Sequence, residues 1–396
     1  MVYVIRLLVA NRRNYPIALI RRTFREKGPL FTQYGVMMRC IRGCHSASII
    51  TLHYLENGSI VIALQFRREL FYLPLMYVIK ALTSMNDQCI KEHMTRCRPG
   101  CVTAMLAFCN EDGIINQKTA LVAIGGRFRV ALEDRVGEWE TSEMLLVLFS
   151  FQDVGRFLLR NCVAIHLDKN EDKFFLLAYM AQKLLALVKG ECASESPDNP
   201  QFQEASVSGH ILLLIIRERL ENILGAARKK IDFEAKRKAE KYHLTSHELI
   251  RAIGTHRSGE ITRGLEFFLA TGNLITRNGL TLQQNNGFSV IAERINQLRF
   301  VSHFRAIHRG AFFMEMRTTD VRKLRPEAWG FICPVHTPDG APCGLLNHVT
   351  ASTRIVAHYS DTTELVKLIG ELGMVGHSAI TLLPTEPVNI AFLAFL

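Results

Sequence analysis

Two cysteines and a histidine, Cys333, His336 and Cys343, lie close together in the sequence and could do chemistry. Thiolate and imidazole groups are typical zinc ligands, and a cysteine thiolate can act as a nucleophile. However, the spacing C-x2-H-x6-C lacks the paired short spacings of structural zinc, and no base is positioned for a nucleophile by sequence. The third interpretation, which we favour, is that both cysteines are small buried residues beside a tight turn. We therefore predict no metal ligand and no catalytic residue in this chain.

A turn lies between the two cysteines, in the segment "TPDG" from Thr337 to Gly340. Proline presets its own φ, an aspartate at this place hydrogen-bonds the local backbone, and glycine accepts a positive φ. The whole stretch from 326 to 348 is dense in proline and glycine and shows neither a helical nor a strand period. The sequence therefore predicts a loop whose backbone path is fixed.

The segment from 298 to 325, just before this loop, is strongly basic. It contains Arg299, Arg305, Arg309, Arg317, Arg322, Lys323 and Arg325, against only Glu315 and Asp320. Aromatic residues, Phe300, Phe304, Phe312 and Phe313, are interleaved with the basic ones. A cluster of one sign with so few acids favours contact with phosphate groups over an ordinary solvated face.

The composition agrees with an anionic partner. The chain has 396 residues, 48 Lys and Arg against 37 Asp and Glu, and a net charge of +11. This charge favours nucleic acid first and a membrane surface second, and the alternative is a basic protein among acidic neighbours. No Asp-x-Asp type of carboxylate cluster is present, as two-metal nucleotidyl transfer would need. No apolar run is long enough to span a membrane, no signal peptide is apparent, and the scattered cysteines indicate reduced thiols in the cytosol or nucleus.

The N-terminal part reads as mixed α/β. Two β-rich runs, 51–54 and 60–66, flank Asn57-Gly58, which is typical of a tight hairpin turn. Helices are predicted over 74–83, 102–109, 118–128 and 142–149. A broadly apolar helix is predicted over 174–189, because Gly190 follows it as a helix stop.

A polar segment with two prolines, "GECASESPDNPQ", follows that helix and predicts a linker and a domain boundary. A long amphipathic helix is then predicted over 207–241. Its apolar positions, at spacings of three and four, are Leu213, Ile216, Leu220, Ile223, Ala227 and Ile231. The opposite face mixes basic and acidic residues and is interpreted as a solvated face rather than a nucleic-acid track.

The segment from Phe300 to Thr350 resembles the fork of the second-largest, β-like subunit of multisubunit DNA-dependent RNA polymerases. The matching residues are Ser302, His303, Arg305, Trp329, Gly330, Cys333, Pro334, Thr337, Pro338, Asp339, Gly340, Gly344 and Leu345. "LATGN" at 269–273 is similar to the segment that leads into the fork. "HRGAFF", "EAWGF", "CPVHTPDG", "NYPIALIRRTF", "TQYGVMMRC", "HYLENGS" and "KGEC" resemble the polymerase I branch, so the resemblance runs from about residue 3 to about residue 375.

The resemblance implies an α+β multidomain fold with a mixed helical and β lobe, a protrusion remnant and a fork. Its order assigns 1–14 to the end of the first protrusion segment, 15–200 to the lobe and 205–270 to the C-terminal protrusion segment. It assigns 271–350 to the fork and 351–396 to an incomplete start of the external domain, with a divergent tail. Members of the family are longer, so we expect a chain truncated at both ends.

The resemblance also implies a function, as part of the active-centre cleft that holds DNA, the DNA–RNA hybrid and nucleotide during ribosomal RNA transcription. It implies nucleic-acid contacts for Arg305, Arg309, Arg317, Arg322 and Lys323, and an active-centre wall formed by His336, Thr337, Pro338, Asp339 and Gly340. Mg²⁺ would be held by the largest subunit and none by this chain. The implied partners are the largest and other subunits of RNA polymerase I, template DNA and product RNA, without a membrane, in the nucleus and nucleolus. The alternative is a non-catalytic truncated product that only binds polymerase subunits or factors.

Overall fold

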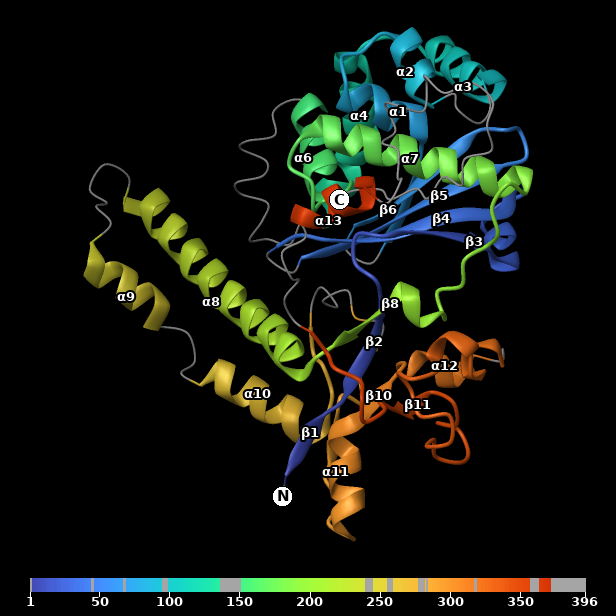
Figure 1. The fold of residues 1–396 in the computed structure, drawn as a ribbon. Coiled ribbons are helices and arrows are strands. Elements are labelled where there is room, and N and C mark those ends of the chain that lie inside the picture. The colour runs from blue at the N-terminus through green and yellow to red at the C-terminus, as the bar shows by residue number, and fades with distance from the viewer. Residues whose placement is uncertain are drawn as a thin grey trace. The chain divides into compact units, whose positions relative to one another are not determined.

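The computed structural model describes residues 2–43, 46–66, 69–94, 99–135, 151–238, 245–254, 259–276, 282, 284–316, 319–356 and 363–371. Residues 1–350 form one compact unit, and residues 351–396 form a second, in which α13 (Thr363–Glu371) is described. Helices and three separate sheets make up the first unit, which confirms the α+β class (Figure 1). Within the described ranges, no helix has the length and apolar character needed to cross a membrane.

The largest sheet has five antiparallel strands in the order β3-β4-β5-β6-β7. These are β3 (Pro16–Ile20), β4 (Phe31–Ile41), β5 (Ala47–Leu55), β6 (Ile60–Phe66) and β7 (Glu69–Pro74), and the 3-10 helix η1 (Arg22–Lys27) connects the first two. The predicted hairpin is confirmed: β5 pairs with β6, and Gly58 has a φ of 82° in the turn. Positive φ is the conformation that glycine adopts without a steric penalty, and this is why the dipeptide marks the turn.

Helices pack against this sheet and share its core. They are α1 (Leu75–Leu82), α2 (Asp87–Met94), α3 (Pro99–Glu111), α4 (Gln117–Arg135), α6 (Phe151–Asn161) and α7 (Asn170–Lys189). The helices predicted near 74–83, 102–109, 118–128 and 174–189 are therefore confirmed, and the one predicted over 142–149 lies outside the described residues. α7 lies across strands β3, β4 and β5 and ends where Gly190 takes a left-handed φ of 78° (Figure 1).

A lysine is buried where α7 begins. Lys173 is 2% exposed, and its Nζ donates a hydrogen bond to the carbonyl of Leu159 at 2.6 Å. Burial, reinforced by the positive charge of Arg42, lowers the pKa of Lys173 to about 8. The folded protein therefore holds this proton less tightly than the unfolded chain does.

Replacing this lysine, Lys173→Met, is expected to change how stability depends on pH. Between pH 8 and about 10.5 the unfolded lysine stays protonated while the folded one does not, so wild-type stability rises with pH in this window. The variant loses that rise, and from pH 7 to pH 9.5 its stability relative to wild type should fall by about 2 kcal/mol. Thermal melting at the two pH values, with the exposed Lys169→Met as control, measures it. Parallel pH profiles for Lys173→Met and wild type would contradict the burial argument.

Two smaller sheets join segments that are far apart in the sequence. β1 (Tyr3–Ile5) pairs with β9 (Ser289–Ile291). The second sheet has the order β11-β10-β2-β8 and consists of β11 (Leu346–His348), β10 (Ala306–His308), β2 (Leu7–Asn11) and β8 (Gln203–Ser206). The N-terminal strand β2 therefore lies between the strand that follows the linker and the strand that follows the basic helix.

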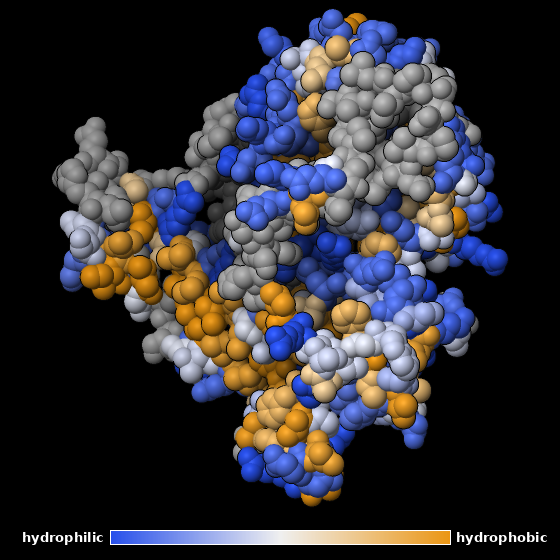
Figure 2. All heavy atoms as spheres, viewed as in Figure 1, coloured by the Kyte–Doolittle hydropathy of each residue, from blue (hydrophilic) through white to orange (hydrophobic). Residues whose placement is uncertain are grey.

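The long helix predicted over 207–241 is confirmed as α8 (Ser208–Lys238), but its predicted apolar face was only partly right. Ile211 and Ile215 are buried with Phe268 of α10 (Glu260–Thr271) and with Phe288, whereas Leu213 is 48% exposed. Other exposed apolar residues on α8 and on α9 (Ser246–Gly254) are Leu220, Leu224, Phe233, Leu249 and Ile250. Figure 2 shows apolar side chains gathered over α8, α9 and α10. The periodicity marked the helix but could not identify which of two apolar stripes the small core covers.

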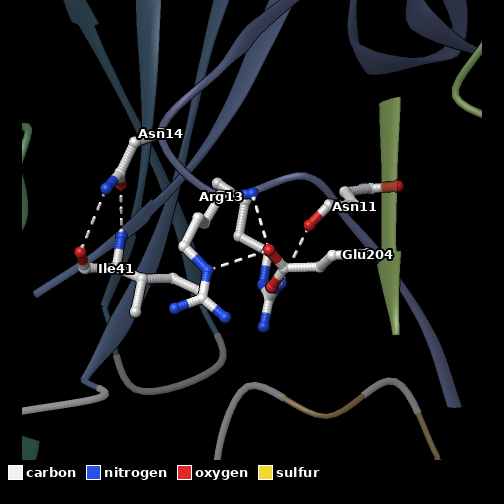
Figure 3. Close-up of polar contacts among 6 residues, drawn as sticks. Asn11, Arg13, Asn14, Ile41 and Glu204 are labelled. Carbon is white, nitrogen blue, oxygen red and sulfur yellow. Dashed lines mark hydrogen bonds and ion pairs between the residues drawn. The ribbon is translucent and has the colours of Figure 1, made fainter. Parts of the chain in front are cut away.

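A glutamate of β8, just after the linker, ties two of the sheets together (Figure 3). The Glu204 carboxylate accepts hydrogen bonds from Arg13 Nε at 2.8 Å and Arg39 Nη1 at 2.9 Å. Arg39 also donates to the carbonyl of Asn11 at 2.8 Å. Arg39 belongs to the five-stranded sheet and Glu204 to the four-stranded one, so this network connects the two sheets. Glu195 of the linker binds Lys183 of α7 and the backbone N–H of Ala18 in β3, so it holds the linker against the five-stranded sheet.

Candidate nucleic-acid interface

The basic segment and the turn-rich loop meet in one pair of strands. The basic helix α11 (Gln297–Arg305) leads directly into β10, which pairs with β11 at the end of the loop. The backbone N–H of Arg309 extends this pairing by donating to the carbonyl of Leu345 at 2.9 Å. His308 is buried beneath, where Nδ1 accepts a hydrogen bond from Gly310 and burial lowers the pKa of the ring to about 4. A neutral imidazole therefore lies under the junction at physiological pH.

The loop is closed at its base and braced across its middle. Cys333 donates its N–H to the carbonyl of His348 at 2.8 Å, which closes the base. Thr337 Oγ1 donates to the carbonyl of Leu346 at 2.9 Å and accepts from the N–H of Gly344 at 2.9 Å, so one hydroxyl joins both arms. The predicted turn is present, with Gly340 at a φ of 84°. The hydrogen bond expected from Asp339 was wrong: its exposed carboxylate bonds no described residue, and Thr337 supplies the brace instead.

Two histidines stack at the base of this loop. The rings of His336 and His348 are 3.4 Å apart between centroids, with 8° between their planes. His348 is buried, and desolvation, followed by the charge of His336, lowers its pKa to about 4. His348 is therefore neutral in this stack at physiological pH. Of the predicted wall residues, His336 and Asp339 are exposed, while Thr337 and Pro338 are partly buried.

Three of the predicted phosphate-binding arginines, Arg305, Arg309 and Arg322, bind backbone carbonyls. Arg305 donates to the carbonyl of Val349 at 3.4 Å and to that of Thr350. Arg309 donates through Nη1 to the carbonyl of Val321 at 2.7 Å, and through Nη2 it pairs with Asp198. Because the side chains of Arg309 and Asp198 are 11% and 15% exposed, this ion pair is largely shielded from water.

The predicted cations that follow Arg309 in the sequence differ from one another in their surroundings. Arg322 Nη1 donates to the carbonyls of Ala341 at 2.6 Å and Cys343 at 2.8 Å, so it holds the loop just after the turn. Lys323 pairs with Asp320 at 2.7 Å, but its side chain is 65% exposed. Arg317 lies outside the described residues. Of the predicted cations that the structure describes, Lys323 is thus the one whose charge is most exposed to solvent.

Removing the Arg322 guanidinium should loosen the loop, whereas removing the neighbouring charge should not. In Arg322→Gln, two carbonyls lose charge-assisted donors, which is expected to cost about 1.5–3 kcal/mol of local stability. Amide hydrogen exchange at Cys343 and Gly344 should accelerate accordingly. Lys323→Gln is the matched control, because it removes the same charge from an exposed side chain. Equal exchange rates in the two variants would show that Arg322 does not hold the loop.

The two cysteines of the loop are free thiols. Backbone N–H groups of Val335 and His336 point at Cys333 and lower its pKa. Cys333 is partly buried, but Cys343 is exposed, so the sequence interpretation of two buried cysteines was wrong for Cys343. Across the described ranges, no group of three or more His, Cys, Asp and Glu side chains is placed to hold a metal ion.

Two residues of this region were not identified as site residues from the sequence. Asp198 lies in the segment that was interpreted as a linker, yet it pairs with Arg309. Arg325 was counted only as one cation of the basic segment, but its Nε is buried without a hydrogen-bond partner among the described residues. The only sequence signal for Asp198 is an acid in a proline-rich segment, which does not indicate a partner more than a hundred positions away.

The sequence matches two family descriptions of RNA polymerase. Residues 38–203 match "RNA polymerase Rpb2, domain 2", and residues 290–355 match "RNA polymerase Rpb2, domain 3". The first match covers most of the five-stranded sheet and its helices, and the second contains the loop and the basic segment. The chain belongs to the Rpb2 family of RNA polymerase subunits.

Within that family, several similar relatives are subunits of RNA polymerase I. The chain is 63% identical over 387 residues to "DNA-directed RNA polymerase I subunit RPA2 homolog" of Caenorhabditis elegans, covering 96% of this chain and 33% of the relative. It is 41% identical to RNA polymerase I subunit RPA2 of Homo sapiens, covering 94% and 32%, and 40% identical to the probable subunit of Schizosaccharomyces pombe, covering 95% and 32%. The chain thus spans about a third of the length of the curated relatives it matches.

Proposed function

We propose that this chain supplies the lobe and fork of the second-largest subunit of DNA-directed RNA polymerase I. The complex would be a nucleotidyltransferase that transcribes ribosomal RNA in the nucleolus. The observation that carries the proposal is the 63% identity to an RNA polymerase I subunit across 96% of this chain. The domain order proposed with it is the end of a protrusion segment over 1–14, the lobe over 15–200, a further protrusion segment over 205–270, the fork over 271–350 and the start of the external domain over 351–396.

In this proposal the turn from His336 to Gly340 forms part of the wall of the active centre. Its support is the bracing by Thr337 and Arg322, which gives the backbone a fixed path beside a moving hybrid. Lys323 would contact phosphates directly. Arg305, Arg309 and Arg322 would add positive potential while holding carbonyls of the loop, and Arg317 completes the proposed set.

The proposed partners are the largest and other polymerase I subunits, template DNA and product RNA. The family implies Mg²⁺ in the assembled enzyme. As the family resemblance implies, we propose that the largest subunit holds this ion. Among the described residues, no group of three or more His, Cys, Asp and Glu side chains is placed to hold a metal ion. The chain's own contribution would be to position nucleic acid and nucleotide and to resist displacement of the wall.

Assembly and the phosphate contact can be tested together. A tagged form of this chain, expressed in cells, should co-purify with the largest subunit of polymerase I, and its absence from the purified enzyme would overturn the assignment. In a complete second-largest subunit that carries this segment, Lys323→Gln should reduce the slope of log K for template binding against log salt by about 0.9. Lys169→Gln, outside the fork, is the matched control and should leave the slope unchanged. An unchanged slope for Lys323→Gln removes the phosphate contact while leaving the assembly result intact.

A further inference from the structure

A cavity of about 230 Å³ lies beside the loop, between the linker segment that contains Asp198, strands β2 and β10, and the residues from Val321 to Cys333. Its volume is below the roughly 300–1,000 Å³ of pockets that hold drug-sized ligands. It is therefore suited to a single side chain or a small ion. None of the contacts described above for the loop fills it.

The wall of this cavity is basic. Four cationic residues line it, Arg309, Arg322, Lys323 and Arg325, against the single acid Asp198. The Nε atoms of Arg309 and Arg325 are both buried and have no hydrogen-bond partner within the described part of the chain. No side-chain hydrogen bond or ion pair connects Arg325 to any other described residue, although its neighbour Lys323 pairs with Asp320. Buried guanidinium N–H groups almost always have an acceptor, so two Nε–H groups without one in the same cavity favour an acceptor group supplied by a ligand.

An apolar groove of about 380 Å³ adjoins this cavity. It shares Leu324, Arg325, Ile332 and Pro334 with the cavity and adds Pro326 and Trp329. Trp329 is 76% exposed and Leu324 is 57% exposed, so large apolar side chains face solvent next to the two unpartnered Nε–H groups. An exposed tryptophan beside a buried arginine is a composition typical of the core of a protein–protein contact.

We propose that this cavity and groove bind an acidic peptide segment of a protein partner. One carboxylate of the segment would accept hydrogen bonds from the Nε–H groups of Arg309 and Arg325, and an adjacent apolar side chain would pack on Trp329. A nucleic-acid backbone fits the site less well, because protein surfaces that bind nucleic acid are more polar and carry their cations openly. Here Arg309 and Arg325 are partly buried, only Lys323 presents its charge openly, and the adjoining groove is apolar. The inference goes beyond the proposed polymerase role and does not depend on it, since it concerns a cavity of this chain alone.

Trp329 supplies the signal for the test. The sequence has two tryptophans, so Trp139→Phe leaves Trp329 as the single indole fluorophore of the full chain. The probes are the peptide acetyl-Leu-Asp-Leu-amide, its isosteric partner acetyl-Leu-Asn-Leu-amide, and inorganic phosphate. The aspartate peptide should change Trp329 emission saturably. Its Kd should be about tenfold below that of the asparagine peptide, because hydrogen bonds to a charged carboxylate are stronger than hydrogen bonds to a neutral amide.

Substitution then locates the carboxylate. Arg325→Gln should abolish the preference for aspartate over asparagine, and Arg294→Gln, the same change at an exposed arginine outside the cavity, should keep it. The comparison of the two peptides is made with Arg325 in place, so its result does not depend on whether Arg325→Gln folds. Equal affinity for the two peptides overturns the proposal. Saturable binding of phosphate that depends on Arg325, without binding of the aspartate peptide, also overturns it and assigns the cavity to a phosphate group instead.

Discussion

Gly344→Ala is expected to destabilise the loop by about 1–3 kcal/mol more than Gly340→Ala, through overpacking. Both glycines have left-handed φ, 73° at Gly344 and 84° at Gly340, so the conformational penalty of an L-residue is common to the two variants. They differ in the space around them. A Cβ at Gly344 would lie 2.5 Å from the carbonyl oxygen of Arg322 and 3.0 Å from its Cα, whereas at Gly340 nothing lies within 4 Å.

The clash at Gly344 is with backbone, and it cannot be relieved by rotating a side chain. Moving the backbone of Arg322 would pull its guanidinium away from the carbonyls of Ala341 and Cys343. We therefore expect one methyl group to disturb the close approach and the arginine brace together. Thermal melting, with hydrogen exchange of the N–H of Gly344 that binds Thr337, measures the effect. If Gly344→Ala and Gly340→Ala melt at the same temperature, the close approach between Gly344 and the backbone of Arg322 does not explain the need for glycine at 344.

The features predicted correctly from the sequence depend on local signals. Asn57-Gly58 determines a turn within a few residues, and the left-handed cap at Gly190 ends α7 because of its own backbone freedom. The helix boundaries near Leu75 and Gln117 likewise follow from periodicity and from neighbouring residues. In each case the energy that selects the conformation is contained in a short segment.

The features that were not predicted depend on contacts between distant segments. The register of Ile307 with Leu7 in parallel strands joins two short apolar runs that fit many other partners equally well. The buried stripe of α8 is chosen by Phe268 and Phe288, which lie more than forty residues further along the chain. Periodicity identifies an apolar stripe, but the tertiary partner determines which stripe is covered.

The candidate site shows the same limit in its electrostatics. The one-sign charge of the basic segment predicted phosphate contacts, yet Arg305, Arg309 and Arg322 have carbonyl partners in the folded chain. A count of charged residues cannot show which carbonyls an arginine will bind. Every residue has a backbone carbonyl, and only the fold places particular carbonyls beside a guanidinium group. The positive segment therefore has a structural role in the loop in addition to the nucleic-acid role that we propose for it.

Glu204→Gln is expected to destabilise the protein by about 2–3 kcal/mol, near the lower end of what breaking a buried ion pair costs. Glu204 is 18% exposed and Arg39 is 13% exposed, so the guanidinium would be left largely desolvated without its counter-charge. Burial already lowers the pKa of Arg39, and the charge of Glu204 opposes that shift. Arg13, at 39% exposed, can turn to water and should contribute less.

A double-mutant cycle separates the ion pair from the loss of the side chains. Glu204→Gln, Arg39→Met and the combined variant should show a coupling energy of at least about 1 kcal/mol in urea denaturation. Glu191→Gln is the matched control, because this glutamate also pairs with a basic residue, Lys189 at the end of α7, but is 53% exposed. Glu204 is in the four-stranded sheet, and Arg39 is in the five-stranded sheet. Additive effects in the cycle would mean that the two sheets are joined by their packing alone, and a positive coupling would make this carboxylate a tie between them.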